Sequence, residues 1–226
     1  MKKLHSTHAL FLIMMLVPFL GMAHNVTSAD QELLRNGGLW AYIQVGATHM
    51  LTGYDHLLFL AGVIFYLKSF KDILKFITVF TIGHCITLIG ATYMGITANE
   101  HLVDAVIALS VLYKGFENLD GFEKWGVKSP NLLLMVGLFG LIHGFGLATR
   151  LQSFDMGQEQ FLAKILCFNL GVELGQVLAL IPIVFSITLA RKHQQFPAFY
   201  KAVNWYLVLA GIGLFLYQIY GYFHGH

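Results

Sequence analysis

Histidines recur in stretches of this sequence that are otherwise apolar. His49 and His56 lie in HMLTGYDH, His84 in FTIGHC and His143 in GLIHGFG, and Asp55 directly precedes His56. A metal-binding or ionisable side chain in a bilayer core is costly, so it needs a partner or a function. Imidazole with carboxylate suits divalent first-row metals such as Ni, Co, Zn, Cu or Fe. These residues therefore predict a site that moves or uses such a cation.

The spacing within the first stretch leaves two alternatives open. His49 and His56 are seven residues apart, so they share a face of a straight helix but lie about 10 Å apart along its axis. Either they serve successive points on a path, or Gly53 interrupts the helix and brings them closer, as broken helices do in other ion sites. Asp55 could ligate the metal, or accept a histidine ring proton and fix its tautomer.

Other apolar stretches carry further candidates. A polar stripe on an otherwise apolar helix should face the interior of a bundle. We expect the metal ligands to be His49, Asp55, His56, His84, His143 and Glu173. We expect the pathway and its supporting residues to include Asn169, Gln176, Thr81, Thr87, Asp104, Glu117 and Asn118.

The segments that position these residues are typical of membrane helices. The chain has 226 residues, 57% hydrophobic and 12% charged, whereas a soluble domain has about 25% charged residues. The apolar runs approach the roughly 20 residues that a spanning helix needs, and they are continuous rather than alternating. We predict an all-α protein with one six-helix transmembrane domain over 24–226. The expected helices are about 39–67, 72–95, 101–119, 131–151, 161–190 and 202–223.

The N-terminus and the loop charges predict an orientation. Residues 1–23 read as a secretory signal peptide, because Lys2 and Lys3 precede an apolar core and small residues end at Ala23; cleavage there is favoured over an uncleaved anchor. Both mature termini are then outside the cytoplasm. Nine lysines and arginines fall inside against three outside, as the positive-inside rule requires. The nine are Lys68, Lys71, Lys75, Lys114, Lys124, Lys128, Arg191, Lys192 and Lys201.

Pairs of glycines predict where helices approach closely. Gly140 and Gly144 form a GxxxG pattern in one apolar segment, and Gly171 and Gly175 form another. Small residues at this spacing let membrane helices pack backbone to backbone. The pattern favours a tight bundle.

Five sequence blocks together resemble the signature of the HupE/UreJ membrane proteins, in the branch with HxxxGxDHLLF. The blocks are HMLTGYDHLLFL (49–60), FTIGHCITL (80–88), ALSVLYKGFENL (108–119), FGLIHGFGLA (139–148) and FNLGVELGQ (168–176). The resemblance implies a signal peptide, a six-helix bacterial inner-membrane protein and permeation of nickel or cobalt, often linked to hydrogenase or urease maturation. It assigns the HxxxGxDH residues to His49, Asp55 and His56, and the fourth-helix histidine to His143. Met50 stands where other members have proline.

We therefore expect a secondary or facilitated permease that moves nickel or cobalt into the cytoplasm, and not an enzyme. The expected partners are the metal ion and the bilayer, with no permanently bound cofactor and with a homo-oligomer compatible with the sequence. The sequence contains no basic patch with interleaved aromatic residues that would indicate nucleic-acid binding. Two alternatives stay open, an intramembrane zinc hydrolase and a membrane metal chaperone or sensor. The lack of an HExxH motif favours the permease over the hydrolase.

Overall fold

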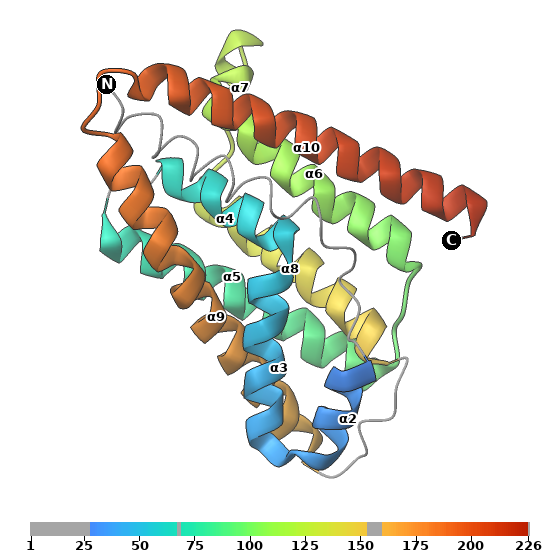
Figure 1. Ribbon diagram of the computed structural model, residues 1–226. Coiled ribbons are helices and arrows are strands. Elements are labelled where there is room, and N and C mark those ends of the chain that lie inside the picture. The colour runs from blue at the N-terminus through green and yellow to red at the C-terminus, as the bar shows by residue number, and fades with distance from the viewer. Residues whose placement is uncertain (1–27, 67–68, 153–159, 226) are drawn as a thin grey trace.

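The computed structural model describes residues 28–66, 69–152 and 160–225, and within these ranges the chain is helical without any strand. The all-α prediction is confirmed for these residues. The predicted signal peptide, 1–23, lies outside them. The helices are α2 (Ser28–Asn36), α3 (Gly38–Thr52), α4 (Tyr54–Tyr66), α5 (Phe70–Met94), α6 (Glu100–Asn118), α7 (Gly121–Lys124), α8 (Leu132–Leu151), α9 (Phe161–Ala190) and α10 (Phe196–His224) (Figure 1).

Four of these helices, α5, α8, α9 and α10, are long and apolar enough to cross a membrane. Their outward faces carry exposed apolar side chains such as Ile86, Phe185 and Leu209, which suits contact with lipid. The chain is therefore a membrane protein. The first predicted segment is divided between α3 and α4, and the third, α6, contains four charged residues. The count of six spans stays a prediction.

Local signals fix where several helices begin and end. Asn99 caps α6 by accepting a hydrogen bond from the Leu102 amide, and Asn131 caps α8 in the same way. Asparagine is a favoured N-cap because its side chain satisfies an amide that has no partner within the helix. Gly95 ends α5 in the left-handed conformation, with φ of 65°, which glycine adopts without steric cost.

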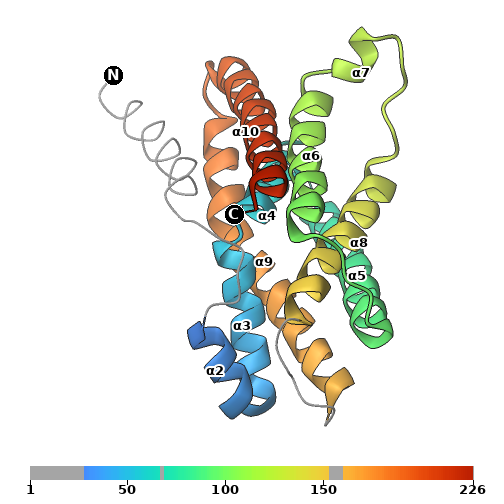
Figure 2. The same cartoon turned by 90° about the vertical axis from the view of Figure 1, so that its right-hand side faces the viewer.

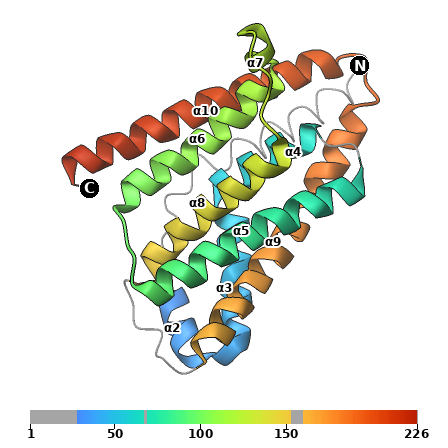
Figure 3. The same ribbon diagram turned by 180° about the vertical axis from the view of Figure 1, so that it is seen from behind.

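The first predicted segment is two helices. The Gly53 amide donates to the His49 carbonyl at 2.9 Å, and Gly53 then turns to an extended conformation with ψ of 93°. The chain restarts as α4 and runs in a different direction from α3 (Figures 1 and 3). Of the two alternatives for this stretch, the interrupted helix is correct. The break places Asp55 and His56 in the first turn of α4, inside the bundle.

Three pairs of helices approach closely at glycines. In each pair, a Cβ added to the glycine would collide with the backbone of the partner helix. The GxxxG prediction is therefore confirmed. The contacts are Gly171–Ile43 and Gly175–Ala47 between α3 and α9, Gly140–Phe80 and Gly144–His84 between α5 and α8, and Gly211–Leu112 between α6 and α10.

The bundle has two ends, which we name the Arg150 end and the Arg191 end (Figures 1 and 2). At the first, Arg150 of α8 pairs with Asp104 near the start of α6. At the second, Arg191 follows α9 and donates to the Phe65 carbonyl at the end of α4. Helices α3, α6 and α9 start at the Arg150 end, and α4, α6 and α9 finish at the Arg191 end.

The charge pattern places Lys114 in a loop, and this prediction is wrong. Lys114 lies within α6 and is 0% exposed. Arg150, one of the three counted outside, also lies within a helix and is buried. Without both residues the count is eight inside, which is nine minus one, against two outside, which is three minus one. The direction of the charge bias is unchanged.

Candidate metal centre

Asp55, His56 and His143 come together at the first turn of α4. One potential ligand atom from each residue lies within 4.8 Å of those of the other two, and all three residues are buried. His143 comes from α8, and its ring centroid is 4.6 Å from that of His56. Two imidazoles and a carboxylate are a donor set that first-row divalent metals prefer.

Two more histidines flank this group. His49, in the last turn of α3, is half-buried, and its ring centroid lies 5.3 Å from that of His56. It approaches from the Arg150 end, because α3 starts there. His84 of α5 is 0% exposed and stacks on Phe80, whose ring lies 5.2 Å from that of His143. The break at Gly53 therefore brings His49 and His56 close together, although a straight helix would separate them.

Hydrogen bonds orient the two histidines of the central group. The His56 Nδ1 atom lies 2.7 Å from Asp55 Oδ1, and the His143 Nδ1 atom lies 2.7 Å from the Phe139 carbonyl. A carbonyl or an ionised carboxylate only accepts, so Nδ1 carries the proton in both rings. The lone pair is then on Nε2. Metal-binding histidines are commonly held in this way, by a carboxylate or carbonyl on the opposite nitrogen.

His84 is oriented by an amide. Its Nδ1 atom lies 2.9 Å from Asn169 Oδ1, while Asn169 Nδ2 donates to the Ile165 carbonyl at 3.0 Å. The second bond fixes which end of the amide faces the ring, so His84 Nδ1 donates and its Nε2 carries the lone pair. Within the described part of the chain, Nε2 of both His84 and His143 is buried without a hydrogen-bond partner. A bound metal ion would accept the lone pair of such an atom.

Asp55 is the carboxylate of this group, and the start of α4 supports its charge. Its Oδ1 atom accepts the His56 amide at 2.7 Å as well as the His56 ring. Acidic side chains in the first turn of a helix are stabilised by the unpaired amides and the helix dipole. The start of α4 is therefore a favourable position for a carboxylate that serves as a cation ligand.

Three phenylalanines close the centre toward the Arg191 end, and we name them the aromatic plug. Phe59 lies 5.3 Å from Phe139 and 6.0 Å from Phe80, measured between ring centroids, and all three are buried. Each lies one turn from a histidine, on the side of the Arg191 end. These buried apolar rings therefore lie between the metal centre and the Arg191 end.

A sequence model of the HupE/UreJ protein family matches residues 23–226. This chain belongs to the HupE/UreJ family. The family is generally related to nickel and cobalt transport, and the resemblance read from the five sequence blocks is confirmed. Neither a curated protein nor a solved structure matches this HupE/UreJ chain.

Several other predicted site residues of this HupE/UreJ protein connect helices around the centre. Thr81 of α5 donates to Gln176 of α9 at 3.0 Å, and Thr87 donates to the Leu141 carbonyl of α8 at 2.6 Å. Glu173 is half-buried on α9. Its carboxylate is not in the close group of ligand atoms found within the described ranges.

The remaining predicted residues lie at the two ends of the bundle. Asp104 is at the Arg150 end, where it pairs with Arg150 and accepts from Gln218 at 3.3 Å. Glu117 and Asn118 are at the Arg191 end. The structure therefore gathers Asp55, His56 and His143 closely, places His49 and His84 beside them, and sets these three polar residues apart.

Sequence reasoning missed the plug and the partners of the end residues. Phe80 and Phe139 each precede a histidine by four residues, and Phe59 follows His56 by three. This helical spacing is a signal that could have identified the plug. The three-residue spacing of Lys114 and Glu117 is a similar signal, because it predicts an ion pair on one helix face.

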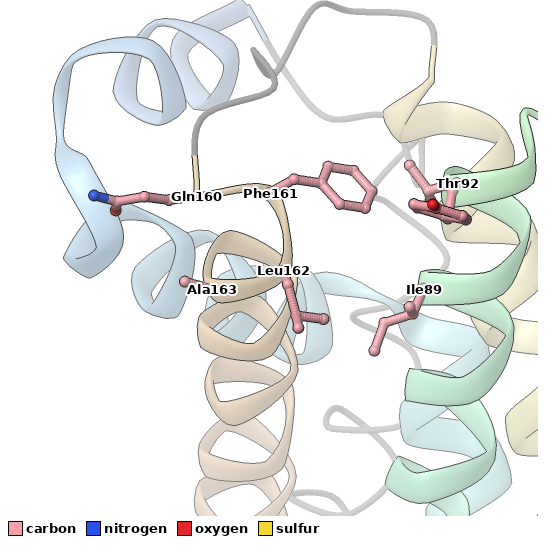
Figure 4. Close-up of a pocket in the computed structure, with 7 residues that line it drawn as sticks. Ile89, Thr92, Gln160, Phe161, Leu162 and Ala163 are labelled. Carbon is pink, nitrogen blue, oxygen red and sulfur yellow. The ribbon is translucent and has the colours of Figure 1, made fainter.

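A separate hollow of about 680 Å³ lies at the Arg150 end between α5 and α9 (Figure 4). Phe161 and Leu162 of α9 project across it toward Ile89 and Thr92 of α5 (Figure 4). Its lining holds no histidine, cysteine or acidic residue among the described residues. The hollow is therefore distinct from the metal centre.

Proposed function

We propose that this HupE/UreJ protein is a permease that moves nickel or cobalt across the bacterial cytoplasmic membrane into the cytoplasm. The observation that carries the proposal is the buried group of Asp55, His56 and His143, in which hydrogen bonds at Nδ1 orient both imidazoles. Family membership supports the same class of function.

The cation enters from the Arg150 end and exchanges part of its water shell for protein ligands. His49, which lies on that side, receives it and passes it to the central group. Three protein ligands leave the coordination incomplete, unlike a closed structural zinc site, so the ion can be released. Exit toward the Arg191 end requires the aromatic plug to move.

The charge distribution supports the proposed direction of transport. The Arg191 end carries the excess of lysine and arginine, so we place it in the cytoplasm. A potential that is negative inside favours entry by about 2.3 kcal/mol per charge per 100 mV. A divalent ion gains about twice that amount, which can drive uptake without ATP.

Metal flux into proteoliposomes tests the proposal. We expect the wild-type protein to transport nickel and cobalt, and we expect His56→Ala and Asp55→Asn to reduce the initial rate by about 10- to 100-fold, because each removes a ligand or its orienting partner. His224→Ala is the matched control, since His224 is exposed at the end of α10. All variants are first compared by gel filtration and thermal unfolding. Wild-type flux in both site variants would refute the site, and loss of folding would assign these residues a structural role.

A zinc hydrolase is the second candidate, because catalytic zinc sites also use three protein ligands and keep the fourth position for water. The same preparations separate the two functions. Rapid metal exchange with flux supports the permease, whereas zinc that stays bound through purification, with no flux, supports the hydrolase.

A further inference from the structure

A second charged group lies inside the bundle, beyond the aromatic plug. Lys114 of α6 is 0% exposed, and its Nζ atom lies 2.6 Å from Glu117 Oε2. The Glu117 carboxylate also accepts from Ser129 at 2.7 Å and from Tyr113 at 3.3 Å. Burying an ion pair costs desolvation energy, and apolar residues in its place often give equal or greater stability. The pair therefore requires an explanation other than packing.

Contacts link this pair to the metal centre. The Tyr113 ring lies 5.3 Å from that of Phe139, whose carbonyl holds His143. His143 and Phe139 are four residues apart, as are Tyr113 and Glu117, so Glu117 lies about 12 Å beyond His143 toward the Arg191 end. The Lys114 stem also contacts α4, because a Cβ added at Gly62 would lie 2.8 Å from Lys114 Cγ. The pair therefore lies on the Arg191 side of the aromatic plug.

The next residue of α6 after Glu117 offers an amide oxygen. Asn118 is buried, and its Nδ2 atom donates to the Gly62 carbonyl and to Asn204, both at 2.8 Å. Its Oδ1 atom is buried without a hydrogen-bond partner in the described part of the chain. Carboxylate and amide oxygens bind nickel or cobalt less well than imidazoles do. Such ligands suit an exit site, which must accept an ion and then lose it.

We propose that Glu117, together with Asn118, is the exit site for the divalent cation, and that the Lys114 ammonium occupies this site until the cation displaces it. The proposal rests on the permease function. Ammonium and metal compete for the same carboxylate, and the flexible lysine stem allows the ammonium to leave and return. With Lys114 in place, the carboxylate is neutralised and binds no other cation.

Binding stoichiometry tests the exit site without requiring transport. Cobalt binding to the purified full chain is measured by equilibrium dialysis for wild type, Lys114→Met and the double variant Lys114→Met/Glu117→Gln. We expect Lys114→Met to bind one more cobalt ion per chain than wild type, and the double variant to lose that extra ion. Lys124→Met is the matched control, because Lys124 is exposed at the same end and donates to the Leu119 carbonyl. It should bind as wild type does.

A folded Lys114→Met protein with wild-type stoichiometry would overturn the exit site. If that variant does not fold, Lys114→Gln replaces it with the same expectation, since its amide can still donate to Glu117. Glu117→Gln gives a further measurement, with wild-type stoichiometry but cobalt flux reduced on the order of tenfold by loss of a ligand contact. Unchanged flux would also overturn the proposal. The extra cobalt ion is counted relative to wild type. A wild-type protein that binds no metal would therefore refute the permease, but the difference in stoichiometry between Lys114→Met and wild type could still be measured.

Discussion

At the scale of single residues, the three buried imidazoles differ in what holds Nδ1. His56 uses the Asp55 carboxylate, His143 a backbone carbonyl and His84 the Asn169 amide. A carboxylate partner increases the basicity of a metal-binding imidazole more than a neutral acceptor does. His56 is therefore expected to be the strongest ligand. The orientation of His84 depends on the Asn169 side chain.

Asn169→Leu should weaken cobalt binding, because it removes the acceptor that fixes the His84 tautomer. We expect a loss of about tenfold in affinity, at the lower end of the range for residues that orient a ligand. Asn169→Asp keeps an oxygen in reach of His84 Nδ1 and should retain most of the binding. Equilibrium dialysis of both purified variants measures the difference. If both variants bind cobalt as tightly as wild type, His84 takes no part in binding.

At the scale of helices, the sequence predicted the boundaries of the helical segments better than it predicted which helices pack together. The apolar runs near 131–151 and 161–190 match α8 and α9 because continuous hydrophobicity marks the length of a membrane helix. Which histidines meet depends on the helix pairs, and the hydropathy of a single segment does not encode that. Lys114 was misplaced for a related reason, since a lysine near a helix end reads as a loop charge until its buried partner Glu117 is seen.

Gly53→Ala tests the break between α3 and α4. A Cβ at this position would lie 2.7 Å from His56 Nδ1 and 3.4 Å from Asp55 Oδ1. The His56–Asp55 pair must then shift, so we expect cobalt affinity to fall by about tenfold or more. Dialysis measures the affinity, and thermal unfolding reports whether the fold is retained.

Gly90→Ala in α5 is the control for that substitution, because nothing lies within 4 Å of its added Cβ. Alanine in an open helix interior should stabilise the protein by about 0.5–1 kcal/mol and leave cobalt binding unchanged. If both alanine variants bind cobalt as wild type does, the close approach at Gly53 does not shape the metal centre.

At the scale of the whole molecule, the metal centre is assembled from the α5–α8 pair and from α4, which lies outside the three glycine-packed pairs. His143 and His84 belong to the α5–α8 pair, whereas Asp55 and His56 belong to α4, which follows α3. Glycine contacts make each pair a closely packed unit. A shift of α4 against the α5–α8 pair would change the ligand distances and move the plug, which spans α4, α5 and α8. In the proposed permease, we therefore expect metal binding and opening of the plug to be coupled through the same contacts.

The proposed direction of transport depends on the orientation of the bundle, which single cysteines can report. Ala98 and Val127 are exposed and lie in loops at the Arg150 end and the Arg191 end. In a background with Cys85 and Cys167 replaced by serine, Ala98→Cys should react with a membrane-impermeant maleimide in cells whose outer membrane has been removed. Val127→Cys should react only after the inner membrane is opened, because the positive-inside rule places its loop in the cytoplasm. Labelling in the reverse order would place the aromatic plug on the external side and make the exit described here the entrance.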